Sequence, residues 1–209
     1  MEKKIKHKED LRVAILEAAK RLFVQEGYES TSIRKIAKEI GFSPTTIYLY
    51  YKDKNDIVYA LHQVGFNMMR DRFFPLMSVD HPFERLKALG KNYIQFALEH
   101  PEYYQVMFMM REPLTFLNAQ LENNKWPEGE VVLNFLKDTI VDCQNNGYFK
   151  GLDPVFVTLQ AWSAVHGIVS LQVTNHFDCV QEVFGKSESM EETVYSSFQV
   201  LVELFNSSK

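Results

Sequence analysis

The chain has 209 residues, a formal net charge of -4 at pH 7 and a hydrophobic content of 46%. This length is sufficient for one small domain and one larger domain. No run of about 18 apolar residues is present, and no apolar segment follows the charged N-terminus, so we expect neither a membrane span nor a signal peptide. The two cysteines, Cys143 and Cys179, lack metal-site spacing, which is typical of free thiols in a cytoplasmic protein.

The charges are distributed unevenly along the chain. Residues 1–55 hold 12 Lys and Arg against 8 Asp and Glu, whereas residues 56–209 hold 11 against 19. A basic N-terminal part on an acidic body is typical of a protein that binds a polyanion at one end. A solvated lysine-rich tail would give the same small excess, and we expect residues 1–8 to form a flexible basic arm.

The first predicted helix runs from residue 8 to residue 26 and ends at Gly27, because glycine adopts a left-handed conformation without steric cost. A second helix follows after Ser32, whose hydroxyl is a good N-cap. Gly41 ends this second helix. Its apolar positions recur at helical spacing and would form one buried face: Ile33, Ile36, Ala37 and Ile40.

Ser43 and Pro44 form a strong helix-start signal only two residues after Gly41, and they predict a third helix over 44–51. Residues 32–51 therefore have the pattern of a helix-turn-helix. Ile47 and Tyr51 share the face that we expect to be buried. The outward positions are Thr45, Thr46, Tyr48, Leu49 and Tyr50.

The first turn of a recognition helix meets base edges in the DNA major groove, so Thr45 and Thr46 are candidate base contacts. Tyr48 and Tyr50 have phenols long enough to reach the phosphate backbone. The alternative interpretation is a helical hairpin with an aromatic surface patch and no nucleic-acid role.

The remaining chain also reads as helical, which predicts an all-α fold of about nine helices. Asp53 is the expected N-cap of a fourth helix that continues through Met69. Later helices are predicted over 82–100, from 101 onward, and over 131–145, 154–174 and 191–205. Residues 112–130 and 176–188 are predicted to be a loop and a connection.

The run from Gly27 to Ile57, GYESTSIRKIAKEIGFSPTTIYLYYKDKNDI, resembles the DNA-binding domain of the tetracycline-repressor (TetR) family of bacterial transcription regulators. The matching features are Gly27, the Thr31-Ser32 pair, Ile36-Ala37, Gly41, Ser43, Tyr48, the aromatic character of position 51, Lys54 and Ile57. Three positions depart from the usual family residues: Ile40, Tyr50 and Tyr51. Because of these departures, the operator sequence cannot be predicted from the family resemblance. The resemblance implies a helix-turn-helix domain over 9–69 and a ligand-binding and dimerisation domain over 70–209, joined by the fourth helix.

The resemblance also implies which residues contact DNA. The implied partner is a double-stranded palindromic operator. The implied contact residues are Arg34, Ser43, Pro44, Thr45, Thr46, Tyr48, Tyr50 and Lys54.

The larger domain is rich in aromatic residues and methionine, which suit a pocket for a small apolar or aromatic effector. An ordinary helical core has the same composition, so both interpretations stay open. Residues 96–108, with Trp162, Ser163, His166 and Gly167, resemble the ligand-domain pattern of one TetR subgroup. The candidate pocket residues are Phe66, Met69, Phe73, Tyr93, Phe96, Tyr104, Met107, Phe108, Trp162 and His166.

The last two long helices are apolar beyond a single face, which is typical of helices that are central or covered by a partner. TetR-like proteins pair these helices into a dimer, and a two-fold dimer would set its recognition helices roughly 34–36 Å apart. The candidate interface residues are Trp162, Val165, Val169, Val194, Phe198, Leu201, Val202 and Phe205. A monomer with both helices internal is the alternative.

None of the six histidines lies in a metal-ligand or catalytic motif, so we expect no enzyme activity, no metal and no cofactor. The expected function is a transcription repressor that a small ligand releases from its operator. Two alternatives remain: a DNA-binding regulator controlled by a protein partner, and a helical ligand-binding protein or enzyme whose helix-turn-helix is only structural.

Overall fold

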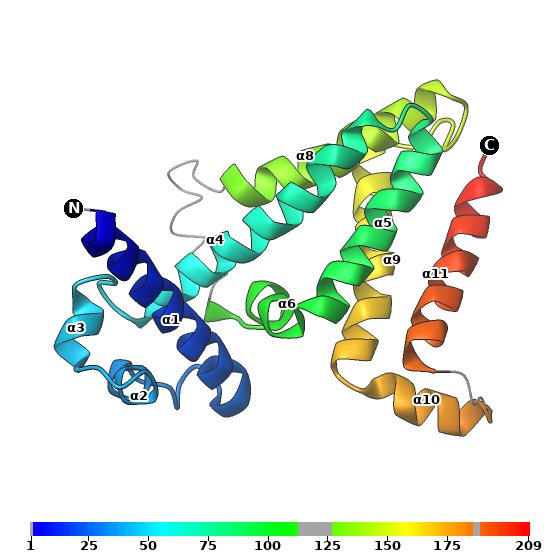
Figure 1. The fold of residues 1–209 in the computed structure, drawn as a ribbon. Helices are drawn as coiled ribbons and strands as arrows, with labels where there is room; N and C mark the ends of the chain where they lie inside the picture. The colour runs from blue at the N-terminus through cyan, green and yellow to red at the C-terminus, as the bar shows by residue number, and fades with distance from the viewer. Residues whose placement is uncertain (1, 113–126, 186–188) are drawn as a thin grey trace. The chain divides into compact units, whose positions relative to one another are not determined.

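A computed structural model describes residues 2–112, 127–185 and 189–209, and within these ranges the protein is helical without any strand (Figure 1). The all-α prediction is therefore confirmed. Contacts within the chain divide it into two compact units. The first contains the residues up to Asn67 together with the segment that starts at Glu102. The second contains Met68–Pro101 and the chain from Glu128 onward.

The first unit contains the helix-turn-helix. Its helices are α1 (Glu2–Glu26), α2 (Ile33–Glu39), α3 (Pro44–Tyr48), the greater part of α4 (Lys54–Phe73) and α6 (Pro101–Phe108). α1 begins six residues before its predicted start and ends, as predicted, just before Gly27, which has φ +81°. Ser32 caps α2 as predicted, since its Oγ accepts a hydrogen bond of 3.2 Å from the backbone N–H of Lys35.

The core of the first unit is made of large side chains from all of these helices. Each such side chain contributes about 1.5–3 kcal/mol when it leaves water. The fully buried members are Ile15, Ile36, Ile47, Ile57, Leu61, Tyr104 and Met107. Gly65 allows α6 to approach α4 closely, because a Cβ at Gly65 would lie 2.2 Å from the Sδ of Met107.

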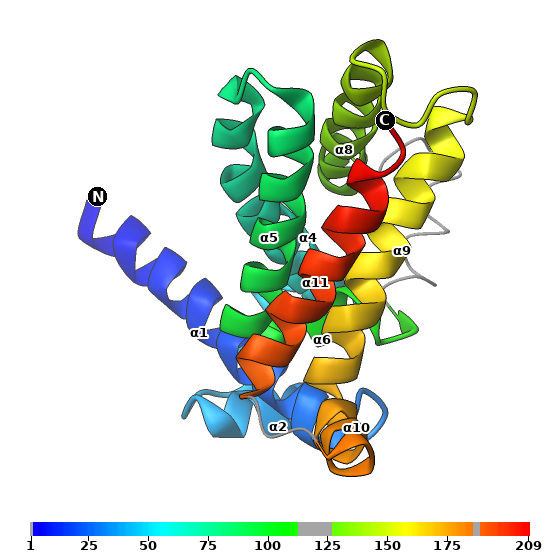
Figure 2. The same ribbon diagram turned by 90° about the vertical axis from the view of Figure 1, so that its right-hand side faces the viewer.

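The second unit is built around α9. Its elements are the short helix η1 (Phe74–Ser78), α5 (Pro82–Glu99), α8 (Pro127–Asn145), α9 (Pro154–Val173), α10 (His176–Phe184) and α11 (Met190–Asn206). α9 contacts α5, α10 and α11, and α9 and α11 lie side by side in both views (Figures 1 and 2). Asp153 caps α9, which was predicted to begin at residue 154, and accepts a hydrogen bond of 2.8 Å from the backbone N–H of Val155.

A buried arginine connects three elements of the second unit. Arg85 of α5 forms an ion pair with Asp142 of α8, and its Nε donates a hydrogen bond of 3.2 Å to Thr139 Oγ1. The same guanidinium donates to the carbonyl of Val79, just after η1, at 3.3 Å. The guanidinium is buried, but the Asp142 carboxylate is half-exposed, so the pair contributes about as much as a charge-assisted hydrogen bond, about 1.5–3 kcal/mol. The group links α8 and η1 to α5.

The prediction that 176–188 is a connection was wrong for 176–184, which form α10, and residues 186–188 lie outside the described part. Phe177 and Gln181 are one helical turn apart and both buried, which gives α10 its inner face. Asn175, in the left-handed conformation at φ +57°, separates α10 from α9. The predicted loop over 112–130 is also corrected, because α8 begins at Pro127; residues 113–126 are outside the described ranges.

By length and composition alone, α9 is apolar enough to cross a membrane. Polar residues interrupt it, however, including Gln160, Ser163 and Gln172, and one of its faces is packed against neighbouring helices. The buried face includes Val157, Ala161, Val165 and Val169. The apolar composition of α9 is therefore explained by a face that is buried against neighbouring helices and by further apolar residues on its exposed side.

The burial of His62 should make the free energy of unfolding depend on pH. This side chain is buried in α4, 4.6 Å from the Phe66 ring, and burial lowers its pKa to about 4. Between the unfolded pKa near 6.5 and the folded value, the unfolded chain binds a proton that the folded chain does not. The free energy of unfolding should therefore fall by about 2 kcal/mol between pH 7.5 and pH 5.

This dependence is measured by urea unfolding of the protein and of a His62→Leu variant at both pH values. The variant should lose about 2 kcal/mol less stability over this interval than the unchanged protein. A control substitution of the exposed His176, His176→Gln, should leave the loss in place. Equal losses in all three proteins would contradict this account of His62.

Candidate nucleic-acid interface

A glycine turn joins α2 to α3. Gly41 has φ +73°, and the backbone N–H of Phe42 donates a hydrogen bond of 2.9 Å to the carbonyl of Ala37. The N–H of Gly41 donates to the carbonyl of Lys38 at 3.2 Å. These bonds occupy carbonyls at the end of α2 that would otherwise be unpaired, and a side chain at this φ would be strained. The turn therefore sets the direction in which α3 begins.

α3 begins at the predicted cap. Ser43 Oγ accepts a hydrogen bond of 3.2 Å from the backbone N–H of Thr46, and Pro44 occupies the first helical position. Ile47 and Tyr51 are buried, as predicted. Arg12 of α1 donates from Nε to Tyr51 Oη at 3.4 Å. This burial fixes which side of α3 faces outward.

The outward side carries most of the predicted DNA contacts. Tyr48 is 56% exposed and Leu49 is 75% exposed, and Ser43 and Thr45 are also exposed. The predicted residues Pro44, Thr46 and Tyr50 are half-buried, and Arg34 is exposed on α2. The helical segment ends at Tyr48, three residues before the predicted end at 51. Hydroxyl and phenol groups therefore gather on one short helix.

Thr46 differs from its neighbour Thr45. Its Oγ1 lies 2.9 Å from Ser43 Oγ, so the two hydroxyls share a hydrogen bond within the first turn. Thr45 has an exposed side chain. Of the two threonines predicted to read bases, Thr45 is the more accessible, and Thr46 also contributes to the cap.

Lys54, predicted to bind a phosphate, has protein partners in this structure. Its Nζ donates hydrogen bonds to the backbone carbonyls of Tyr28, at 2.6 Å, and of Thr31, at 3.0 Å. Nζ also lies 3.8 Å from the centroid of the Tyr28 ring. Each of these hydrogen bonds from the charged ammonium contributes about 1.5–3 kcal/mol to stability, whereas an exposed ion pair contributes about 0–1 kcal/mol. The contacts of Lys54 within the protein are therefore stronger than an exposed ion pair would be.

Sequence reasoning missed Tyr28 and Asn55 as parts of this arrangement. Tyr28 Oη donates a hydrogen bond of 2.5 Å to Asn55 Oδ1. Burial and the nearby carboxylates of Asp53, Glu112 and Glu29 raise the pKa of Tyr28, so its phenol keeps the proton that it donates. An aromatic residue directly after the glycine that ends α1 was the signal available in the sequence.

Three of the predicted pocket residues form a polar group in the second unit. Tyr93 Oη lies 2.9 Å from His166 Nδ1, and Trp162 Nε1 donates to Tyr93 Oη at 3.3 Å. Because the indole can only donate, Tyr93 Oη accepts from Trp162, and the tautomer of His166 sets whether Tyr93 Oη or His166 Nδ1 donates in the second bond. Burial lowers the pKa of His166 and favours the neutral ring.

The other predicted pocket residues are buried or half-buried in their own units. Met69, Phe73 and Phe96 belong to the second unit. Phe66, Tyr104, Met107 and Phe108 belong to the first, where the Phe108 ring lies 5.7 Å from Phe66 and 5.1 Å from Tyr104. The use of these residues as a ligand pocket stays a prediction. Among the described residues, no cluster of acidic, histidine or cysteine side chains has the arrangement of a metal site.

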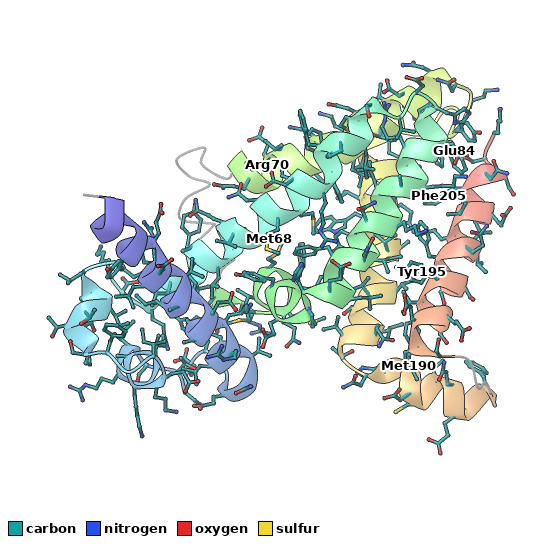
Figure 3. All side chains as sticks on the ribbon, viewed as in Figure 1. Met68, Arg70, Glu84, Met190, Tyr195 and Phe205 are labelled. Carbon is teal, nitrogen blue, oxygen red and sulfur yellow. The ribbon has the colours of Figure 1, made fainter. Side chains whose placement is uncertain are left out.

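The predicted interface residues lie mainly on the inner sides of α9 and α11. The buried ones are Val165, Val169, Val194, Phe198 and Val202, and the partly buried ones are Trp162, Leu201 and Phe205. Figure 3 shows Phe205 on the inner side of α11. Its ring packs edge-to-face with that of Phe149, and the two ring centroids are 5.4 Å apart. The use of these eight residues as a dimer interface stays a prediction.

The same two helices expose other apolar residues, which the candidate interface residues do not include. Phe156 of α9 is 70% exposed and Leu204 of α11 is 66% exposed. The complete set is Val155, Phe156, Leu159 and Leu171 on α9, with Val200 and Leu204 on α11. We call these six residues the outer apolar face. Both helices face the viewer in Figure 2.

A capped recognition helix that follows a glycine turn and packs on α2 defines a helix-turn-helix domain of the DNA-binding type. Comparison with known families agrees with this class. The model of the bacterial regulatory proteins of the tetR family matches residues 15–61, and the model of the tetracyclin repressor-like C-terminal domain matches residues 86–204. The chain belongs to the TetR family.

Curated relatives match the chain over about half of its length. The HTH-type transcriptional regulator SAR2658 of Staphylococcus aureus (strain MRSA252) is 30% identical over 109 residues, which are 52% of this chain and 59% of the relative. The HTH-type transcriptional regulator SAUSA300_2515 of strain USA300 is 29% identical over 109 residues, with the same two shares. The match thus covers about three fifths of these relatives.

Solved structures match nearly the whole chain and show the same fold. The fatty acid degradation regulator FadR from Bacillus halodurans has a TM-score of 0.71 at 21% identity, covering 91% of this chain and 94% of that one. FadR from Bacillus subtilis in complex with stearoyl-CoA has a TM-score of 0.68 at 20% identity, covering 91% and 97%. AibR in complex with isovaleryl coenzyme A and operator DNA has a TM-score of 0.61 at 22% identity, covering 78% and 85%.

The cap of α3 should be separable from its exposed surface by two substitutions of Ser43. Ser43→Ala removes the acceptor for the Thr46 N–H and should destabilise the protein by about 1 kcal/mol. Ser43→Asp keeps a good cap acceptor, so stability should stay near that of the unchanged protein. Urea unfolding at pH 7 measures both. Equal destabilisation by the two substitutions would contradict the assigned capping role.

Proposed function

We propose that this protein is a homodimeric transcription regulator of the cytoplasm that binds operator DNA through α3 and represses transcription until an effector binds. The observation that carries the proposal is the orientation of α3. Burial of Ile47 and Tyr51 directs Thr45 and Tyr48 away from the protein. The TetR-family match and the curated relatives, which are transcriptional regulators, support the same function and give no reason to propose an enzyme.

The exposed residues divide into two roles by their chemistry. Thr45, in the first turn of α3, can donate to a base and place its methyl against a thymine methyl. Tyr48 and Tyr50 have phenols suited to phosphate oxygens, and Arg34 of α2 adds a cation for the backbone. Ser43 and Thr46 share a hydrogen bond and can contact phosphate from the same turn.

The outer apolar face supports the dimer. Its six large apolar side chains lie on two neighbouring helices and are exposed in the single chain. A second copy related by a two-fold axis would cover this face with the same face of its partner. Such a dimer presents two α3 helices, and its operator would be an inverted repeat with half-sites spaced by about one DNA turn, roughly 34–36 Å.

The effector that we propose is a small molecule with an apolar chain and an uncharged polar group. The aromatic and methionine-rich core suits the chain. The neutral group of Tyr93, Trp162 and His166 offers hydrogen bonds without a formal charge, which suits a carbonyl. Two of the matched structures hold acyl-CoA molecules, whose acyl chain and uncharged thioester carbonyl have this chemistry, with a charged coenzyme A part beyond it.

Release of DNA requires that the effector bind more tightly to a conformation that cannot hold the operator. α4 is the element through which we propose this coupling acts. It contains residues of both units, with Asn67 in the first and Met68 in the second. A change in the direction of α4 would alter the separation of the two recognition helices in the dimer.

A second candidate function is a DNA-binding regulator without a small-molecule effector. The observation that favours it is the internal hydrogen bonding among Tyr93, Trp162 and His166, which is what a filled core would also show. Regulation would then depend on a protein partner. Both candidate functions include operator binding by α3. Operator binding and the response to an effector are therefore tested by two separate experiments.

Removing the exposed groups of α3 should abolish sequence-specific binding and leave the fold intact. We expect the double substitution Thr45→Ala with Tyr48→Ala to weaken operator binding by about a hundredfold or more, since each contact is worth about 1–3 kcal/mol. Fluorescence anisotropy with operator and random DNA measures this, and circular dichroism checks the fold. A folded double variant that binds the operator as tightly as the unchanged protein would show that α3 is not the recognition helix.

Acyl-CoA molecules should release the protein from its operator. Titration with stearoyl-CoA or isovaleryl-CoA is expected to lower operator affinity, while coenzyme A without an acyl chain should have little effect. His166→Leu should raise the ligand concentration for half-release by about tenfold, because one hydrogen bond is lost. If neither compound changes operator affinity, the acyl-CoA assignment fails and the effector-free alternative is favoured.

A further inference from the structure

The ammonium group of Lys54 lies inside the helix-turn-helix domain and contacts the turn between α1 and α2. We propose that Lys54 is a positioning residue, which joins this turn to the first turn of α4 and so holds α2 and α3 in their DNA-binding arrangement. This role replaces the phosphate contact expected from the family resemblance. The inference rests on the proposed function, because it concerns how the domain is prepared to bind DNA.

The contacts of Nζ are the first step. An ammonium has three N–H donors, and two of them are used by the carbonyls of Tyr28 at 2.6 Å and Thr31 at 3.0 Å. The Tyr28 ring lies against the same ammonium, with Nζ 3.8 Å from its centroid. A cation over an aromatic face is attracted by the ring quadrupole, so three interactions hold the same charge in place.

The turn that Lys54 contacts is fixed to α1 by its own hydrogen bonds. Thr31 is almost fully buried, and its hydroxyl proton is shared between the carbonyl of Gly27, at 2.9 Å from Oγ1, and that of Leu22, at 3.2 Å. The Thr31 N–H donates to the Tyr28 carbonyl at 3.2 Å. The turn is therefore a defined structure that a single cation from α4 can hold as a unit.

Tyr28 strengthens the connection from the other side. Its ring packs on Phe23 of α1, with centroids 5.5 Å apart, and its hydroxyl donates to Asn55 Oδ1 at 2.5 Å. Lys54 and Asn55 are the first two residues of α4. Two neighbouring residues of α4 thus bind the same tyrosine, one through the backbone and ring and the other through the hydroxyl.

The location of the bonded carbonyls links this arrangement to DNA binding. Thr31 directly precedes Ser32, the residue that caps α2, and α2 is followed by the turn that directs α3. A shift of the Thr31 carbonyl would move the start of α2, and α3 would move with it. Lys54 can therefore influence operator binding without contacting DNA itself.

A phosphate contact would work against these bonds. To extend toward DNA, the Lys54 side chain would have to give up the Tyr28 and Thr31 carbonyls, which would lose their charged donor. Lys52, two residues earlier, has an exposed side chain, whereas Lys54 is half-buried. Lys52 is therefore the more accessible of the two lysines for a phosphate, whereas Lys54 is already bonded to two backbone carbonyls.

The test uses operator and random DNA over a range of salt concentrations with three proteins: the unchanged chain, Lys54→Met and Lys52→Met. The two variants lose the same charge. Lys54→Met should bind the operator at least about tenfold more weakly, since two charge-assisted hydrogen bonds are removed. Its slope of log affinity against log salt should stay near that of the unchanged protein, and its affinity for random DNA should fall much less than its affinity for the operator.

A lost phosphate contact gives a different result. The slope of log affinity against log salt would become shallower by about 0.9 in Lys54→Met, and operator and random DNA would lose affinity equally. That result would overturn the inference and leave the proposed function intact. If the unchanged protein shows no salt-dependent operator binding, the proposed function fails and this inference fails with it.

A second variant covers the case in which Lys54→Met does not fold, as checked by circular dichroism below the unfolding temperature. Tyr28→Leu removes the ring and the hydroxyl and keeps the lysine charge. Positioning predicts a loss of discrimination between operator and random DNA in folded Tyr28→Leu. Unchanged discrimination in that variant would contradict the proposed role, because a phosphate-binding Lys54 does not need Tyr28.

Discussion

The burial of Ile47 and Tyr51 is the constraint on which the rest of this domain depends. A helix of five residues has no stability of its own in water, because nucleation costs more than one turn of hydrogen bonds returns. α3 exists because its cap at Ser43, its buried Ile47 and the buried Tyr51 three residues beyond its end hold it on the first unit. The same burial determines which residues face outward, so stability and recognition come from opposite sides of one short helix.

The second unit shows a related division on α9. One side of this helix packs against α5 and α11, and the other side keeps large apolar residues in contact with solvent. A single helix that is apolar on both sides needs two coverings, one from its own chain and one from outside. The proposed dimer supplies the second covering, and its two-fold symmetry would pair the recognition helices that the first unit presents.

Local signals made the helix-turn-helix readable from sequence. Ser32, Gly41 and Ser43 act on their immediate neighbours, so their type and spacing were enough to place α2 and α3. The partners of Lys54 were not readable, because Tyr28 and Thr31 lie 26 and 23 residues earlier in the chain. The sequence showed that α9 and α11 are apolar beyond one face, but the interface residues predicted from it lie mostly on the inner sides, since the sequence does not say which side the chain itself covers. The inner face of α10 consists of only Phe177 and Gln181, too weak a pattern to separate a helix from a connection.

The most direct test of the central claim, that paired α3 helices read a specific operator, is selection of bound sequences from a random DNA library with the purified full-length protein. The account predicts enrichment of an inverted repeat whose half-sites are centred about one DNA turn, roughly 10 base pairs, apart. Enrichment should be lost when the centre-to-centre spacing is changed by about half a turn, because the two recognition helices would then face different sides of the duplex. Recovery of unenriched DNA, or of a single unpaired half-site, would contradict the account.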